Sequence, residues 1–156
     1  MTDLFHVVLV EPEIPHNTGN IGRTCVAMNC HLHLVEPLGF SLKEKQVRRA
    51  GLDYWKTLNL TQYKNYPDWQ NAFSQKKCYF FTTKTDRSLF EVNFQPGDAL
   101  VFGPETRGLP AEVLEQNKDN LVTIPMLGSV RSLNLSNAVA IAVYEAYRKA
   151  KQSLPY

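Results

Sequence analysis

Three polar loops in the sequence carry residue types that could bind a ligand with anionic or hydroxyl groups. The first, EPEIPHNTGNIGR, follows an apolar run and supplies Asn17, Asn20 and Arg23. The second is GPETRGLP, with two glycines, two prolines and two opposite charges. The third, PMLGSVRSLNLSN, crowds small polar residues ahead of an apolar helical pattern. A helix N-terminus offers free N–H groups and the positive end of a dipole, so the third loop suits hydroxyls or a carboxylate.

Arg23 is the residue of the first loop that most needs an explanation. A helix expected over residues 18–29 would place it one turn from the start, where the dipole disfavours a cation. An anionic partner such as a phosphate would explain the arginine, and the alternative is a solvated surface side chain. The loop is not a dinucleotide fingerprint, because Gly19 and Gly22 are three apart and no third glycine follows.

The other two loops also have purely structural interpretations. Gly103 and Gly108 permit a close approach or a backbone conformation that a side chain would block. Glu105 and Arg107 would, in the simplest interpretation, form a local ion pair on a surface turn. Asn134 could serve only as a helix cap. Neither interpretation explains the whole pattern, so we expect a rigidly held site.

The surrounding elements predict how these loops come together. Apolar runs predict strands over residues 5–10, 31–36, 58–63, 77–83, 98–103 and 120–125. Helices are expected over residues 18–29 (capped by Asn17 or Thr18), 41–50, 67–76, 110–117 and 134–150. This alternation predicts an α/β fold with a mostly parallel sheet flanked by helices. Ligands of such sheets bind beyond the carboxyl ends of the strands, where all three loops are expected.

The composition is that of an ordinary globular protein. The 156 residues are expected to form a single domain over residues 1–156, and the net charge of +2 does not by itself indicate nucleic acid. No signal peptide and no apolar run of about 20 residues is recognised, so we expect no membrane segment. Three cysteines form no disulfide framework, which favours a reduced, cytoplasmic protein.

A group of metal-binding residue types occurs at Cys25, Cys30, His31 and His33. We favour a structural interpretation, because CHLHLV alternates like a strand and Cys25 falls on the apolar face of a helix. No metal site is therefore predicted.

The three loops together resemble the motifs of a known family. NTGNIGR, FGPETRGLP and IPM…RSLNLSNAVAIAVYEA are similar to the three motifs of the SPOUT-class, TrmH-like RNA 2'-O-ribose methyltransferases. LVEPEIPHNTGNIGR, HLVEPLGF and RRAGLDYW resemble its small single-domain group, the TrmL or YibK type, which methylates the wobble cytidine or uridine of tRNA. The resemblance covers about residues 5–148.

This resemblance implies a fold, a cofactor and partners. The fold would carry a deep C-terminal trefoil knot whose loops bind S-adenosyl-L-methionine, and the protein would be a homodimer that acts on a tRNA anticodon stem-loop without a metal. The implied cofactor-binding residues are Phe81, Thr82, Thr83, Gly103, Pro104, Glu105, Gly108, Ile124, Met126, Ser132, Leu133 and Asn137. The implied catalytic residues are Arg23, Asn20, Ser132, Asn134 and Tyr144, and the RNA-binding residues are Arg23, Lys43, Lys45, Arg48, Arg49 and Arg131.

Several details stay open at this point. Glu105 could polarise a donor hydroxyl or pair with Arg107, and Tyr144 could stack on a base or pack in a dimer. The RNA target could be another tRNA or rRNA position. A SPOUT protein that binds RNA without catalysis is the alternative from another functional class. The sequence also differs from the group's usual pattern at Gly22, where an extra apolar residue is common.

Overall fold

A parallel sheet forms the centre of the molecule. The computed structural model describes residues 2–43 and 54–154, and in this part of the chain six strands pair in the order β3-β2-β1-β5-β4-β6. Every pairing between these strands is parallel. The strands are β1 (His6–Val10), β2 (His31–Val35), β3 (Leu60–Tyr63), β4 (Cys78–Phe81), β5 (Ala99–Phe102) and β6 (Leu121–Val122). The predicted α/β fold with a mostly parallel sheet is confirmed.

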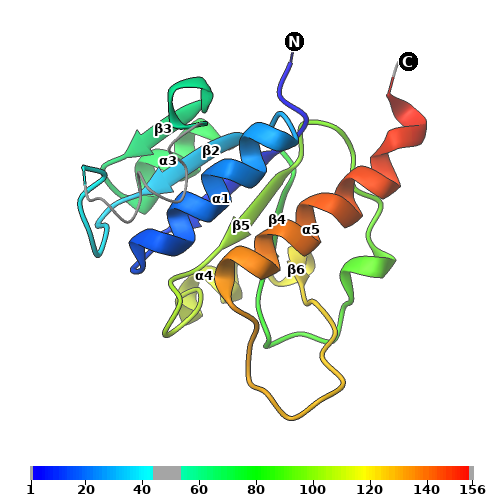
Figure 1. Ribbon diagram of the computed structural model, residues 1–156. Coiled ribbons are helices and arrows are strands. Elements are labelled where there is room, and N and C mark those ends of the chain that lie inside the picture. Colours follow the sequence, from blue (N-terminus) through cyan, green and yellow to red (C-terminus); the bar gives the residue numbers. More distant parts are fainter. Residues whose placement is uncertain (1, 44–53, 155–156) are drawn as a thin grey trace.

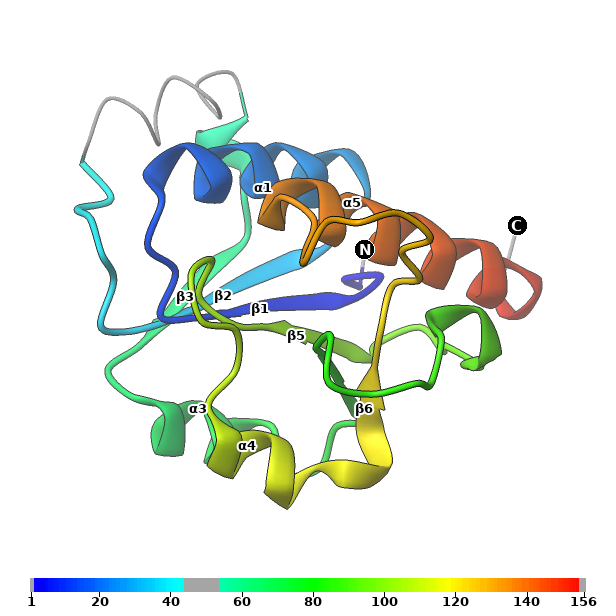
Figure 2. The same ribbon diagram turned by 90° about the horizontal axis from the view of Figure 1, so that it is seen from below.

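Helices cover both faces of this sheet (Figure 1). Helices α1 (Pro15–Ala27) and α5 (Leu135–Ala150) lie side by side on one face, and α3 (Tyr66–Ala72) and α4 (Ala111–Gln116) lie on the other, as Figure 2 shows. Short 3-10 helices occur at Trp55–Thr57, Leu89–Glu91, Lys118–Asn120 and Lys151–Ser153. Because the strands are parallel, the loops that follow β1, β5 and β6 all emerge at the carboxyl edge.

Two apolar cores lie on the two faces of the sheet. Ile21 of α1 and Val143 of α5 are fully buried against the side chains of alternate residues such as Leu9 and Leu34. On the opposite face, Trp69 of α3 packs with residues that include Val8, Val10, Phe80 and Val113. Residues buried on both faces explain why the strands read as continuous apolar runs rather than alternating ones.

The start of α1 differs from the prediction. The helix begins at Pro15 rather than residue 18, with Ile14 at the N-cap and no side-chain cap. Asn17 and Thr18, predicted as caps, lie inside the helix and are buried. Proline suits the first position of a helix for two reasons. It has no N–H group that would lack a partner there, and its fixed φ angle is already close to the helical value. Arg23 is consequently about two turns from that start, and the argument that the dipole disfavours it was wrong.

Other element boundaries also moved. The predicted strand over residues 120–125 shrinks to β6, because Pro125 and the residues before it enter the third loop. The predicted helix over residues 41–50 is not present at residues 41–43, where Ser41 instead accepts a hydrogen bond from the backbone of Lys43. The remainder of that prediction lies outside the described residues.

The described part of the chain contains no helix that is both long enough and apolar enough to cross a membrane.

Candidate active site

A cavity of about 660 Å³ lies at the carboxyl edge of the sheet. It is enclosed by the segments that follow β4, β5 and β6 and by the N-terminal turn of α5. The structure brings together here eleven of the twelve residues expected to bind a cofactor: Phe81, Thr82, Thr83, Gly103, Pro104, Glu105, Gly108, Ile124, Met126, Ser132 and Leu133. Arg131 and Asn134 also line it. A cavity of this size, with mixed apolar and polar walls, suits a small-molecule ligand.

Two glycines allow the loop after β5 to fold back on itself. A Cβ atom at Gly103 would collide with the backbone of Gly108 and Leu109. Gly108 has a φ angle of +66°, in the left-handed region that favours glycine. The close approach inferred from sequence therefore exists. It is an approach of the loop to its own backbone, which holds one wall of the cavity in place.

Glu105 fixes this loop to the start of α1. Its carboxylate accepts hydrogen bonds from the backbone N–H groups of Glu13 at 2.7 Å and Ile14 at 2.8 Å, and from the Asn17 amide at 3.3 Å. The negative charge also lies at the positive end of the α1 dipole. Of the two alternatives for Glu105, the ion pair with Arg107 is wrong, because the Arg107 guanidinium lies 3.5 Å from Glu11 instead.

A second contact strengthens the same junction. The Glu13 carboxylate accepts hydrogen bonds from the backbone N–H and the hydroxyl of Thr106, at 2.9 and 2.7 Å. These bonds lower the pKa of Glu13. Glu105 of the second loop thus binds the first loop, and Glu13 of the first loop binds the second.

The Glu105 contacts can be tested by the substitution Glu105→Gln. The amide keeps the shape but has only one acceptor oxygen, so one of the two backbone N–H groups loses its partner. Hydrogen bonds to charged groups contribute about 1.5–3 kcal/mol, and we expect a decrease of that order in the free energy of unfolding by denaturant titration. Glu112→Gln, in the exposed first turn of α4, is the control, because it removes a charge at a helix N-terminus with no hydrogen bonds to another loop of the described chain, and it should lower stability by less than about 1 kcal/mol. A decrease no larger in Glu105→Gln than in Glu112→Gln would contradict this role.

Asn134 joins the third loop to the first. Its side-chain oxygen accepts from the backbone N–H groups of Ser136 at 2.9 Å and Asn137 at 3.3 Å, so the expected N-cap of α5 is confirmed. Its amide nitrogen donates to Asn17 Oδ1 at 3.1 Å. Together with Glu105, this makes a continuous connection from the β5 loop through α1 to α5.

A second, smaller cavity of about 360 Å³ lies between α1 and α5. It is lined by Asn20, Arg23, Asn137 and Tyr144. The implied catalytic residues are therefore divided, since Ser132 and Asn134 line the first cavity. Asn137, expected to line the cofactor pocket, lies in the second cavity because it is on a different side of α5 from Leu135 and Ala138, which line the first. The start of α5 thus contributes side chains to both cavities.

Arg23 is exposed and rests on an aromatic ring. Its guanidinium carbon lies 4.9 Å from the centre of the Tyr54 ring, and its Nη2 donates to the Tyr54 hydroxyl at 3.4 Å. A guanidinium that stacks on an aromatic face keeps its charge and most of its donors free. Arg23 thus lines the second cavity with most of its N–H groups available. A Cβ atom at Gly22 would lie 3.3 Å from Trp55, so glycine there leaves room for the segment that holds Tyr54.

Positive side chains surround the first cavity. Arg131, Arg107 and Lys84 all line it and all are exposed. Lys43, also expected to bind RNA, is exposed in the segment after β2. Lys45, Arg48 and Arg49 lie outside the described residues. The exposed cations form a surface that suits a polyanion.

Sequence reasoning did not foresee the roles of three residues at the site. Asn17 was named as a polar residue of the first loop and as one of two possible caps, but it is 4% exposed and bridges Glu105 and Asn134. Lys84 follows β4, and its position directly after a predicted strand was a signal by which it could have been included. Tyr54 belongs to the motif RRAGLDYW, but nothing in the sequence links it to Arg23.

A family comparison decides how these cavities are to be interpreted. The model of the SpoU rRNA Methylase family matches residues 4–144. The chain belongs to this family. The expected membership of the TrmH-like SPOUT class is therefore confirmed, and the loops that line the two cavities all lie within the matched residues.

Individual SpoU relatives narrow the comparison. The tRNA (cytidine(34)-2'-O)-methyltransferase of Saccharophagus degradans is 49% identical, over 94% of this chain and 96% of the relative. A solved structure that concerns 2'-OH methylation of C/U34 on tRNA is 46% identical, with a TM-score of 0.89 over 93% of this chain and 95% of the other. The SpoU methyltransferase AviRb from Streptomyces viridochromogenes, in complex with the cofactor AdoMet, is 26% identical, with a TM-score of 0.81 over 96% of this chain and 59% of the other.

Proposed function

We propose that this SpoU-family protein transfers a methyl group from S-adenosyl-L-methionine to the ribose 2'-hydroxyl of the wobble nucleotide, cytidine or modified uridine, in tRNA. The observation that carries the proposal is the pairing of two cavities at the start of α5. One is lined by glycine-containing loops, and the other is lined by the exposed Arg23 guanidinium. This arrangement provides separate places for a methyl donor and for a phosphate-bearing acceptor.

The first cavity fits the methyl donor. Its volume exceeds that of a nucleoside-sized ligand, and Phe81 and Phe102 give it an apolar floor beneath polar loop atoms. The loop folds tightly back on itself at Gly103, and its residues line the cavity, where a ligand can reach their backbone groups. The donor would lie against the loops of residues 103–108 and 123–134, within reach of Ser132 and the backbone around Met126. When bound, it supplies an electrophilic methyl group attached to sulfur.

Arg23 would hold the acceptor. Arginine stays protonated in proteins and binds phosphate through two parallel hydrogen bonds, so its role is to orient the target ribose and to stabilise negative charge. Asn20 lines the same cavity and would support that orientation. Methyl transfer requires the oxygen, carbon and sulfur atoms in line, and rigid placement of the two reactants contributes much of the rate. The reaction needs no metal.

The choice of tRNA over rRNA rests on the relatives. The family description refers to rRNA, but relatives that match nearly the full length act on cytidine 34 of tRNA. Arg131, Arg107 and Lys84 around the cavity, together with Lys43, would contact phosphates of the anticodon stem-loop. A tRNA substrate would place the reaction in the cytoplasm.

Methylation of total tRNA tests the function directly. Labelled S-adenosyl-L-methionine is supplied with tRNA from a strain that lacks this protein, and the modified nucleotide is mapped by mass spectrometry. A 2'-O-methyl group at the wobble position is the expected product. Label at another position, or in rRNA only, would revise the proposed substrate but not the proposed methyl-transfer reaction. Absence of both label and donor binding would favour an RNA-binding protein without catalysis.

We also infer that residues 1–156 act as one domain, threaded as a deep C-terminal trefoil knot, and as a homodimer. The knot is supported by the loops of residues 103–108 and 123–134, which wrap the same cavity. The homodimer is supported by exposed apolar side chains on α5, where Ile141 is 41% and Tyr144 is 53% exposed. Tyr144 also lines the cavity of Arg23, so a second protomer packed there would close the acceptor site.

The substitution Ile141→Glu is expected to weaken this dimer. A charge introduced into an apolar interface loses its hydration, so sedimentation equilibrium should show at least a tenfold weaker association, about 1.4 kcal/mol or more. Ala111→Glu places the same charge on the exposed start of α4 and should leave the dimer intact. A wild-type chain that sediments as a monomer at all concentrations would refute the inferred dimer.

A further inference from the structure

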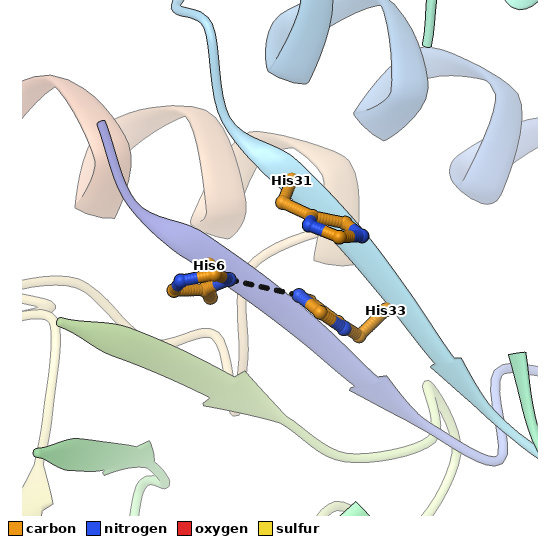
Figure 3. Close-up of side chains that lie close together, drawn as sticks. All are labelled: His6, His31 and His33. Atoms are coloured by element: carbon orange, nitrogen blue, oxygen red, sulfur yellow. Dashed lines mark hydrogen bonds between the residues drawn. The ribbon is translucent and has the colours of Figure 1, made fainter. Parts of the chain in front are cut away.

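Three histidines meet on the sheet face that is opposite to α1 and α5. His31 and His33 are two apart on β2, so their side chains emerge on the same face, and His6 is the register partner of His31 on the adjacent strand β1. One ring nitrogen from each histidine lies within 4.8 Å of the others. Figure 3 shows the rings gathered between the two strands. Strand pairing alone thus assembles three imidazoles.

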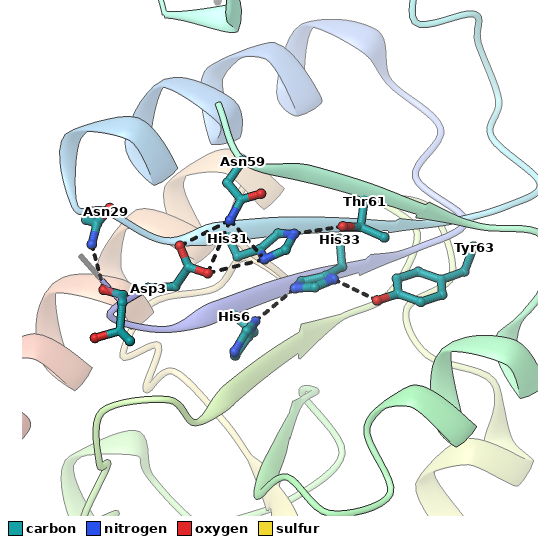
Figure 4. A network of polar contacts seen from close by, with 9 residues as sticks. Asp3, His6, Asn29, His31, His33, Asn59, Thr61 and Tyr63 are labelled. Carbon is teal, nitrogen blue, oxygen red and sulfur yellow. Dashed lines mark hydrogen bonds and ion pairs between the residues drawn. The ribbon is translucent and has the colours of Figure 1, made fainter. Parts of the chain in front are cut away.

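The outer nitrogens of two rings are held by hydroxyl groups. The Tyr63 hydroxyl lies 3.1 Å from His33 Nδ1, and the Thr61 hydroxyl lies 2.8 Å from His31 Nε2. Both hydroxyls come from β3, on the far side of β2 from His6 (Figure 4). The second nitrogen of the His33 ring, Nε2, faces His6, whereas His31 Nδ1 lies 3.2 Å from the Asn59 side-chain nitrogen and 3.3 Å from the Asp3 carboxylate. A hydrogen bond at the far nitrogen is the usual way in which a protein orients an imidazole that binds a metal ion.

The inner atoms have spacings that suit a small cation. His6 Nδ1 lies 2.9 Å from His33 Nε2, and the Asp3 carboxylate lies 3.3 Å from His31 Nδ1. Ligand atoms at about 2.0–2.1 Å from a tetrahedral Zn²⁺ are separated by about 3.3 Å. Asn59 donates to both Asp3 oxygens at 3.2 Å, which holds this carboxylate beside His31.

Burial and nearby charges both act on this cluster. Burial lowers the pKa of His6 to about 4 and that of His33 to about 2, with smaller contributions from the charges of Lys76 and His31. Lys76 opposes a cation here, but its side chain is exposed and can turn into water, whereas Asp3 favours one.

We propose that His6, His31 and His33 form a Zn²⁺ site, with the Asp3 carboxylate beside His31 as a supporting negative charge. The rings of His31 and His33 are stacked, with centres 4.0 Å apart, so binding requires them to rotate until their lone pairs converge. In the bound form each neutral imidazole would carry its one proton on the nitrogen away from the ion, namely His6 Nε2, His31 Nε2 and His33 Nδ1, so no proton is released from the rings. This site lies at the amino ends of β1 and β2, away from the methyl-transfer cavities, and would clamp these strands and the N-terminal segment.

The metal-binding residue types that lie close together in the sequence are not the ones that lie close together in the structure. Cys25 and Cys30 are buried in the core beneath α1, on the other face of the sheet, and burial raises the pKa of both thiols. His6 takes their place from a strand 25 residues earlier than His31. Only the register of β1 with β2 brings His6 to the other two histidines.

Calorimetric titration of ZnCl2 into the full-length, chelator-treated protein tests the proposal. We expect one saturable site per chain, and His6→Gln and His31→Gln should each weaken Zn²⁺ binding more than tenfold. The chain has four histidines, and His16→Gln on α1 is the control, because it removes an exposed imidazole elsewhere. It should bind Zn²⁺ like the wild type. Cys78→Ser should also bind Zn²⁺ like the wild type, which would show that the half-buried Cys78 thiol is not a ligand.

Thermal unfolding gives a second measurement. At about a hundredfold excess over Kd, Zn²⁺ should raise the Tm of the wild type and of His16→Gln by roughly 5–10 °C, and should not raise that of His31→Gln. Chelation should leave methyl transfer unchanged. The proposal is overturned if the wild type shows no saturable binding, or if His6→Gln and His31→Gln bind Zn²⁺ as the wild type does. The cluster would then be a neutral polar network only.

Discussion

Replacing Arg23 with alanine is expected to lower methyl transfer to tRNA by about 10²–10³-fold while donor affinity changes by less than about twofold. Loss of a single group that stabilises transition-state charge typically has an effect of this size. Donor affinity should persist because Arg23 lines the second cavity, whereas the proposed donor residues line the first. Initial rates with labelled donor and calorimetry with unlabelled donor measure the two quantities separately.

Two further variants test how Arg23 acts. Arg23→Lys keeps the charge but loses the planar donor pair, so we expect a rate between those of the wild type and Arg23→Ala. Tyr54→Phe removes the 3.4 Å hydrogen bond and keeps the ring beneath the guanidinium, and it should reduce the rate only slightly. A large loss of donor affinity in Arg23→Ala, or an unchanged rate, would contradict the role assigned to this residue.

The substitution Gly103→Ala should have the second large effect, on both donor binding and stability. A single Cβ atom at this position collides with backbone atoms of Gly108 and Leu109, which cannot move away as a flexible side chain could. Forcing extra volume into a packed region typically decreases stability by about 1–3 kcal/mol, which corresponds to a Tm decrease of roughly 3–10 °C. Because the displaced loop is a wall of the first cavity, donor affinity should fall at least tenfold.

Gly128→Ala provides a matched control for this prediction. Gly128 lies in the third loop, and a Cβ atom there meets nothing within 4 Å, so Tm and donor affinity should stay unchanged. Gly108→Ala is an intermediate case, since it has free space but a φ angle of +66°. Wild-type affinity and Tm in Gly103→Ala would show that this loop can relax around a side chain.

The fold class and the location of the site could be predicted from the sequence, because both follow from patterns of residues that are close together in the chain. Apolar runs mark β1, β2, β4 and β5, which are buried on both faces, and the alternation of strands with helices favours parallel pairing. Parallel pairing then places the unusual loops after β1, β5 and β6 at one edge. Asn134 could be recognised as the α5 cap because its bonding partners are two and three residues away.

The start of α1 could not be predicted in the same way. Its N-terminus is held by Glu105, which is 91 residues from Ile14 in the chain. A local search for a capping residue found Asn17 and Thr18, which the fold buries within the helix. The contact between the first and second loops also explains why Glu105 pairs with backbone N–H groups rather than with its neighbour Arg107.

The sequence by itself determined the strands, the polar loops that follow them and the family to which they belong, because these depend on residues close together in the chain. The tertiary structure alone decided which distant side chains meet. It divided Arg23 and Ser132 between two cavities, set Tyr54 beneath the guanidinium, and brought His6 to His31. Such contacts depend on strand register and helix packing, and no spacing along the sequence encodes these directly.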